Sequence, residues 1–355
     1  MEFNKYRIDE ITINLDNLRK PLNNEQRKQI SNKKLYPYYG ANNIMDYVDE
    51  YIFDEEIICI AEDGGSWGFG EKCSYIVNEK CWVNNHAHVL KAKDHNLNLK
   101  YLNYYLNYHD LNSKITGTTR GKLTKSALSS IEIMLPNREK QDAIVNTLDK
   151  AQELIDKRKE QIDQLDELVK SRFIEMFGDP IINSKGLKVK NFEEVVRLQR
   201  GFDLPTYARN ENGIYNVWGS NGILSKHSTY KVDEPGIVTG RSGSLGKVYY
   251  TTEPYWPLNT TLFSKNTYGN NVVYLAYLLR FYKLERFSNG TGVPTLNRNL
   301  LDGKKIIDTP LEKQNEFAEF VKHVDKLKFE MEKSLKELED NFNSLMQKAF
   351  KGELF

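Results

Sequence analysis

Apolar residues recur every three or four positions along two long stretches of the chain, within 136–180 and 310–355, and the positions between them are charged or polar. This spacing is typical of a helix with one narrow apolar stripe, as in a coiled coil. Neither predicted helix contains Pro or Gly in its interior. Each helix would be about 60 Å long at 1.5 Å per residue. The predicted seam consists of Ile144, Leu148, Ile155, Ile162, Leu165 and Phe173 in the first helix, and of Phe317, Val321, Val324, Met331, Leu338, Phe342 and Leu345 in the second, where Lys328 interrupts it.

The second long helix repeats the plan of the first. Pro136 precedes "NREKQDAIV" and Pro310 precedes "LEKQNEFAEF", so both begin with Pro and then Glu-Lys-Gln. A lone helix with so narrow a stripe is marginally stable in water. We therefore expect the two helices to pack antiparallel against each other, and we expect a pseudo-twofold axis to relate the two halves of the chain.

The sequence around the helices alternates short β-branched or aromatic runs with Gly and Asn turns. This pattern predicts strands at 55–61, 86–92, 235–240 and 246–252, and short helices at 99–109 and 272–282. The predicted fold class is α+β, with two similar globular domains and two long helices. We place the boundaries at 1–135, 136–180, 181–309 and 310–355.

The globular segments also resemble each other. Residues 38–44, "YYGANNI", match 217–223, "VWGSNGI", and 62–68, "EDGGSWG", match 240–246, "GRSGSLG". Weaker matches join 82–91 with 257–265 and 115–128 with 288–301. Because self-similarity at a fixed period signals a repeated architecture, the whole chain reads as one duplicated unit.

Charge distinguishes the segments. Residues 181–309 carry 17 basic and 10 acidic residues, a net charge of +7, whereas the other three segments are each slightly acidic. A basic segment is suited to phosphates. No apolar run reaches the 18 residues of a membrane span, and the start of the chain lacks the apolar core of a secretion signal. With three cysteines, an odd number, we expect a soluble cytoplasmic protein.

At this point the residues resemble a known family. The run "SRFIEMFGDPIINSKGL" (171–187), after a long helix opened by "LPNREKQDAIV" (135–145), is similar to the specificity subunit of type I restriction–modification systems. The second copy, from "TPLEKQNEFAEFV" (309–321) to "LMQKAFKGELF" (345–355), is similar to the C-terminal helix of that family. The resemblance covers the whole chain and is specific in the helices and in the "MFGDP" junction.

The resemblance implies two target recognition domains, each reading half of a bipartite, asymmetric site in double-stranded DNA. The helices would set the gap between the half-sites and bind methyltransferase subunits, and restriction subunits would add cleavage. S-adenosylmethionine and ATP would belong to these partners. We find no Asn-Pro-Pro-Tyr or Asp-Pro-Pro-Phe stretch and no nuclease cluster, so we expect the chain to be non-catalytic by itself, with no bound metal and no membrane contact.

Polar and aromatic residues on the Gly-rich loops that align between the repeats are the expected DNA readers. Asn pairs with adenine and Arg with guanine in the major groove, although Gly and Asn also simply form tight turns. The candidates are Tyr39, Gly40, Asn42, Asn43, Ser66, Thr118, Thr119 and Arg120 in the first domain, and Trp218, Ser220, Asn221, Arg241, Ser242, Ser244, Asn289, Thr291 and Arg298 in the second.

Three other motifs have a structural interpretation beside a functional one. Cys59, Cys73 and Cys81 with His86 and His88 suggest zinc, but they lack a C-x-x-C pair, so a structural role is favoured. The run 242–248, "SGSLGKV", departs from the phosphate-binding loop pattern at both ends. The tyrosines of 99–109 suit a buried helix face better than base stacking.

Two other functions compete with DNA recognition. A self-contained DNA methyltransferase would need a Gly-rich cofactor-binding strand–helix unit, which we do not find. A coiled-coil scaffold or tether would hold two protein-binding modules apart, but it would leave the net charge of +7 without a purpose.

Overall fold

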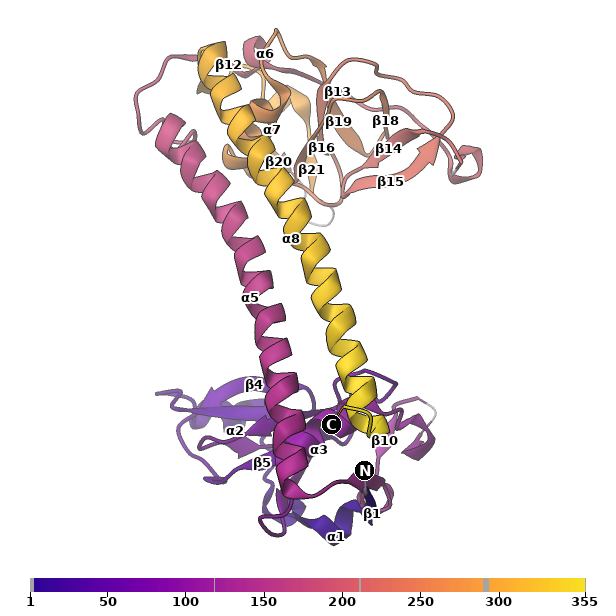
Figure 1. Ribbon diagram of the computed structural model, residues 1–355. Coiled ribbons are helices and arrows are strands. Elements are labelled where there is room, and N and C mark those ends of the chain that lie inside the picture. The colour runs from indigo at the N-terminus through magenta and orange to yellow at the C-terminus, as the bar shows by residue number, and fades with distance from the viewer. Residues whose placement is uncertain (1–2, 118, 211, 290–293, 355) are drawn as a thin grey trace. The chain divides into compact units, whose positions relative to one another are not determined.

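The computed structural model of the protein describes residues 3–117, 119–210, 212–289 and 294–354. The chain forms two compact units, the first from residues 1–158 and 334–355 and the second from residues 159–333. Two long helices, α5 (Arg138–Phe177) and α8 (Leu311–Lys351), each contribute one part to each unit (Figure 1). Within the described ranges, no helix is both long and apolar enough to cross a membrane.

The two long helices pack antiparallel inside each unit. In the first unit, Leu148 near the start of α5 shares a core with Met346 near the end of α8. In the second unit, Phe173 near the end of α5 packs on Phe317 near the start of α8, with ring centroids 5.4 Å apart. The predicted seam is buried at Ile144, Leu148, Ile155, Ile162, Leu165, Phe173, Phe317, Val321 and Val324, and half-buried at Met331, Leu338, Phe342 and Leu345.

The interruption of the seam at Lys328 has a local explanation. Its Nζ lies 2.7 Å from Oδ2 of Asp166 on α5, and the side chain is 27 % exposed. The aliphatic stem therefore stays at the seam while the ammonium group reaches the rim. The seam also contains buried residues that the sequence pattern did not include, among them Val145 and Met346.

The first unit is built from small sheets, mostly antiparallel, and short helices. One sheet has the strand order β2-β8-β5-β6, another β4-β3-β7, and β1-β11 and β10-β9 form two-stranded pairs. The bounds are β1 Asn4–Arg7, α1 Ile8–Ile11, β2 Thr12–Asn14, η1 Asp16–Leu18, α2 Asn24–Gln29, β3 Tyr36–Gly40, β4 Asn43–Val48, β5 Ile57–Ala61, β6 Ser74–Val77, β7 Trp82–Val83, β8 Ala87–Ala92, α3 Leu99–Tyr108, η2 Asn112–Lys114, β9 Ile115–Thr116, β10 Lys122–Leu123, α4 Lys125–Ser129 and β11 Glu132–Leu135.

The second unit repeats this topology. Its sheets have the orders β13-β19-β16-β17 and β15-β14-β18, with β12-β22 and β20-β21 as pairs. The bounds are β12 Val189–Asn191, α6 Phe192–Val195, β13 Arg197–Arg200, η3 Thr206–Ala208, β14 Tyr215–Gly219, β15 Gly222–His227, β16 Gly236–Gly240, β17 Val248–Thr251, β18 Tyr255–Pro257, β19 Thr261–Asn266, α7 Val272–Phe281, η4 Leu284–Phe287, β20 Ser288–Asn289, β21 Thr295–Leu296, η5 Arg298–Leu300 and β22 Lys305–Ile307.

The duplication extends to irregular details. The β3–β4 pair shifts register between Tyr38 and Tyr39, and the β14–β15 pair shifts between Val217 and Trp218. The central strand of each three-stranded sheet also pairs in parallel with the third strand. The four predicted strands and the two predicted short helices are confirmed as β5, β8, β16, β17, α3 and α7, with bounds within two residues of those expected.

The shared Glu-Lys-Gln opening of the long helices is explained by its glutamines. Gln141 is fully buried, accepts a hydrogen bond from the Asn98 amide at 2.8 Å and donates to the carbonyl oxygens of Asn96 and Pro136. Gln314 accepts from the Asn271 amide at 2.9 Å in the same way. Each glutamine therefore ties the start of a long helix to the segment that opens α3 or α7.

Candidate nucleic-acid interface

Three segments of the first unit meet beyond the end of β5. They are the β3–β4 turn, the loop 62–70 and the β9–β10 hairpin. Asn42 Nδ2 donates to the carbonyl oxygen of Gly64 at 3.1 Å, which joins the turn to the loop. The Leu123 amide donates to the carbonyl oxygen of Glu62 at 2.8 Å, and Asp63 forms a β-bridge with Lys122. The loop therefore lies between the turn and the hairpin and contacts both.

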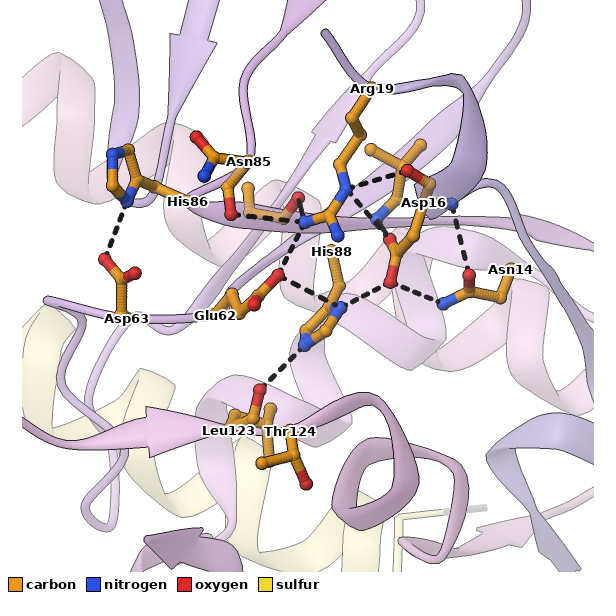
Figure 2. A network of polar contacts seen from close by, with 12 residues as sticks. Asn14, Asp16, Arg19, Glu62, Asp63, Asn85, His86, His88, Leu123 and Thr124 are labelled. Atoms are coloured by element: carbon orange, nitrogen blue, oxygen red, sulfur yellow. Dashed lines mark hydrogen bonds and ion pairs between the residues drawn. The ribbon is translucent and has the colours of Figure 1, made fainter. Parts of the chain in front are cut away.

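Asp63 is the centre of the polar contacts in this loop. Its Oδ1 accepts from Arg120 Nη2 at 2.5 Å and lies 2.8 Å from His86 Nδ1 (Figure 2 shows the His86 contact). The Asp63 side chain is 18 % exposed, whereas that of Arg120 is 64 % exposed. The carboxylate thus lies below the surface, and the guanidinium lies above it, open to a ligand.

A buried histidine lies beneath the loop. His88 Nδ1 lies 2.7 Å from the Asp16 carboxylate and Nε2 lies 2.8 Å from the carbonyl oxygen of Leu123 (Figure 2). Both ring nitrogens thus face an oxygen, one from a carboxylate and one from a backbone carbonyl, and the ring bridges the two groups. His88 therefore joins Asp16 to Leu123, at the base of the hairpin that carries Arg120.

The carboxylates of this network are held in their charged form. Burial alone would raise the pKa of Asp16, but the hydrogen bonds from His88 and from the Val89 amide outweigh it, and the pKa lies below its ordinary value. Burial would likewise raise the pKa of Glu62, but Arg19 at 2.6 Å and Lys122 at 2.9 Å lower it. The first unit thus neutralises its acidic loop from within.

The second unit brings the corresponding segments together. The Leu296 amide donates to the carbonyl oxygen of Arg241 at 2.8 Å, and Ser242 forms a β-bridge with Thr295. A methyl group on Gly240 would lie 3.3 Å from Cβ of Ser220, so the β14–β15 turn contacts the loop after β16. The turn, the loop and the β20–β21 hairpin therefore repeat the arrangement of the first unit.

The alignment of the two loops is shifted by one residue from the sequence match. The match paired Glu62 with Gly240, but the backbone contacts pair it with Arg241. Both residues have an amide that donates at 2.9 Å, to His86 and to Thr260 respectively, and a carbonyl that accepts from the hairpin. Equivalent backbone positions thus carry a carboxylate in one unit and a guanidinium in the other. The match of 115–128 with 288–301 agrees with the strand registers.

Not every predicted reader is at the surface. Tyr39, Gly40 and Trp218 are buried, and Tyr39 stacks on Tyr75 and donates to Glu79 at 3.0 Å. We therefore assign these three residues to the support of the turns, which corrects the expectation that they face DNA. Asn43 has φ of 133°, a conformation that favours glycine, so it also serves its turn.

The remaining candidates divide into three sets. Thr118 and Thr291 lie outside the described residues. Asn42, Ser66, Thr119, Arg120, Asn221 and Asn289 are exposed on the turns, loops and hairpins, and Ser220, Arg241, Ser242 and Ser244 are half-buried there. Arg298 is exposed on η5 and donates from Nη1 to the carbonyl oxygen of Leu198 at 3.4 Å, beside a groove of the same unit.

The structure also shows where the three other motifs lie. Gly246 is followed by the strand β17 and not by a helix, so the run 242–248 does not form a phosphate-binding strand–loop–helix unit. Tyr101 and Tyr105 are buried in the core of the first unit, where they contact Phe350. In the described part of the chain, no three His, Cys, Asp or Glu side chains are grouped so as to hold a metal.

The sequence reasoning missed several polar residues at these loops. Asp63 and Lys122 adjoin the predicted readers but were not included. The signal that could have found Asp63 is its place next to Gly64, which has φ of 68° and forms the loop. Arg200 and Asn259 carry no comparable signal, because only the pairing of strands β13 and β19 brings them together.

Comparisons with known proteins agree with this duplicated architecture. The family model described as "Type I restriction modification DNA specificity domain" matches the chain twice, over residues 2–167 and 184–340. A candidate type I restriction enzyme specificity subunit of Haemophilus influenzae is 26% identical over 330 residues, 87% of this chain and 84% of that protein. A candidate type I specificity subunit of Mycoplasma pneumoniae is 22% identical over 311 residues, 81% of each chain.

Solved structures show the same fold. The S subunit of a type I restriction–modification system from M. genitalium superposes with a TM-score of 0.64 at 16% identity, covering 99% of this chain and 96% of that one. A chain from a structural study of assembly and conformational transition in the type I restriction–modification system superposes with a TM-score of 0.60 at 14% identity. The superposition covers 99% of this chain and 98% of that one. With two matched domains that span most of its length, the chain belongs to the family of type I restriction–modification DNA specificity proteins.

Proposed function

We propose that the chain recognises a bipartite DNA site, one half through the loops of each unit. The observation that carries this proposal is the repeated cluster of turn, loop and hairpin, whose backbone is the same in both units while its side chains differ. The loops and hairpins carry Asp63 and Arg120 in one unit and Ser242 and Asn289 in the other. Different donors and acceptors on one scaffold are what two different half-sites require.

The long helices are suited to partner subunits. Several large apolar side chains on α5 and α8 are exposed although the helices already pack on each other. They are Leu154, Leu168, Ile174, Leu311, Leu327 and Phe329. Exposed apolar groups among charged ones are typical of protein–protein contacts. We assign these exposed side chains to contact with methyltransferase subunits, with restriction subunits joining the complex, and we assign S-adenosylmethionine and ATP to those partners. The helix lengths would then set the gap between the half-sites.

The experiment that tests this function maps modified adenines in DNA from cells that express the chain together with a type I methyltransferase subunit. The expected result is a split motif that disappears when the chain is omitted. Methylation that does not change when the chain is omitted would contradict the proposal. A motif without a gap would contradict its bipartite part alone.

A further inference from the structure

Two arginines of the second unit share one neutral acceptor. Arg200 Nε lies 3.4 Å from the carbonyl oxygen of Asn259, and Arg241 Nη1 lies 3.5 Å from the same oxygen. Both contacts are long, and each guanidinium carries five N–H donors. Two like charges therefore converge on an oxygen that cannot neutralise them, and most of their donors remain available.

The same unit has an open groove of about 1170 Å³ beside this pair. Arg200, Lys265 and Arg298 line the groove, and all three are exposed. Among the described residues, neither these three nor Arg241 takes part in an ion pair, although neighbouring Arg197 pairs with Asp302 at 3.4 Å and Lys190 pairs with Asp308 at 3.1 Å. Three of the four basic residues that line the groove therefore have no ion-pair partner among the described residues.

The carboxylates of the groove already have partners. Glu193 accepts from the Gly303 amide at 2.8 Å, and Glu194 accepts from the Asn191 amide at 2.8 Å. Asp203 accepts from the Asn259 side chain. These contacts hold the three carboxylates in place, and with the four basic residues Arg197, Arg200, Lys265 and Arg298 the lining has a formal net charge of +1.

Two of the four corresponding positions in the first unit have the opposite sign. Arg241 corresponds to Glu62, as the backbone contacts of the two loops establish. Arg200 lies opposite Leu262 in the β13–β19 pair, and Leu262 takes the place of His88, which holds Asp16. Figure 2 shows how that unit neutralises both carboxylates with its own histidine and arginine. The second unit has no such internal balance.

We propose that Arg200, Arg241, Lys265 and Arg298 bind phosphates of the DNA backbone, and that Asp16 and Glu62, which take the places of Arg200 and Arg241 in the first unit, make no such contact. This inference rests on the proposed function. Guanidinium groups bind phosphate oxygens through charge-assisted, often bidentate hydrogen bonds. The backbone is then held chiefly by the second unit, whose segment 181–309 has the net charge of +7.

The test measures how DNA affinity depends on salt. The full chain with its methyltransferase subunits is titrated against a labelled duplex at several KCl concentrations, with Arg200→Gln, Lys265→Gln and Arg298→Gln as single variants. Each phosphate contact adds about 0.9 to the steepness of log affinity against log salt, so each variant should lower the steepness by about that amount. The loss should be equal on target and on random duplexes, because phosphates carry no sequence information.

The first unit supplies a matched control. Lys91 occupies the strand position of Lys265, and its Nζ lies 3.1 Å from Glu55. Lys91→Gln removes the same charge from a neutralised site, so the salt dependence should stay that of the wild type. Thermal unfolding of every variant verifies that these exposed substitutions leave the fold intact.

The outcomes separate the inference from the function on which it rests. If the wild type binds DNA and the three variants keep its salt dependence, the phosphate site is wrong and the proposed function stands. A loss confined to the target duplex would also overturn the inference, since it would mean base contact. Equal loss in Lys91→Gln would mean that any surface charge has this effect. A wild type that binds no duplex at low salt would refute both.

Discussion

Arg120 Nη2 lies 2.5 Å from Oδ1 of Asp63, and this contact holds an exposed cation over a carboxylate that is mostly covered. The same oxygen lies 2.8 Å from His86 Nδ1, so Asp63 is itself held in place. A long side chain that is already ordered loses less conformational entropy when it binds. Arg120 is therefore prepared for contact with a base edge, and its remaining donors face outward.

Replacing Arg120 should change the base preference at one position of one half-site. A bidentate arginine–guanine pair contributes about 1–3 kcal/mol of discrimination, so Arg120→Gln should relax the methylated motif at a single base pair. Sequencing of methylated adenines in cells measures this directly. Arg7→Gln is the control, because Arg7 is an exposed arginine of the same unit that pairs with Asp9. An equal loss of affinity for every sequence would show that Arg120 contacts phosphate.

Removing the buried imidazole should destabilise the first unit. His88→Leu would remove the imidazole contact from both the Asp16 carboxylate and the Leu123 carbonyl, in a site where His88 is 1 % exposed. Loss of one partner of a buried charged pair costs about 3–5 kcal/mol. Calorimetric unfolding measures the loss.

A second variant distinguishes this cause from simple misfit. The double variant Asp16→Leu, His88→Leu removes both partners, and replacing both partners by apolar groups is much less costly than removing one. It should therefore be more stable than His88→Leu alone. A double variant that is less stable than the single one would show that the pair is not the source of the loss.

Acid should weaken the first unit through Asp16 and Glu62. Their pKa values in the folded chain lie below the unfolded values of 3.8 and 4.5, so the unfolded chain binds more protons in acid. The stability that they contribute is complete above pH 4.5 and is lost as the pH falls through the lower, folded values. The urea midpoint should decline below that pH, and less steeply in Asp16→Asn. An identical decline in Asp16→Asn would show that this carboxylate has no part in it.

The two buried glutamines should matter more than the charged residues beside them. Gln141→Ala leaves the Asn98 amide without its acceptor, and Gln314→Ala does the same to the Asn271 amide. An unsatisfied buried group costs about 1–3 kcal/mol. Glu139→Ala, at an exposed position of the same motif, should stay within about 0.5 kcal/mol of the wild type. Calorimetric unfolding tests all three, and equal effects would contradict the role of the buried glutamines.

Much of the architecture was predictable because it is repeated. The long helices are predictable from an apolar stripe, such as Ile144, Leu148 and Ile155. The motif Glu-Lys-Gln marks the start of both helices. The strands β5 and β16 are short apolar runs between turn residues, which is a local signal. A duplicated sequence shows each such signal twice. The fold could therefore be predicted from the spacing of apolar residues and from comparison of the two halves of the chain.

The site was less predictable because its residues meet only through tertiary pairing. Tyr39 and Trp218 align between the repeats. Such an alignment indicates a shared structural position and not contact with DNA, and both rings are buried in the core. Asp63 and Arg120 lie 57 residues apart and meet because the hairpin pairs with the loop. The one-residue shift that joins Glu62 with Arg241 also follows from backbone hydrogen bonds, which no side-chain pattern encodes.

The division of the chain into units has a consequence for its synthesis. The second unit is one continuous segment, 159–333, and all of it is translated before residues 334–355 of the first unit are added. The first unit cannot complete its core until later, because Met346 and Ala349 of that core lie at the far end of the chain. Domains generally fold as units once their sequence is available. The domain translated first is therefore the one completed last, and until then it exposes the apolar face that Met346 will cover.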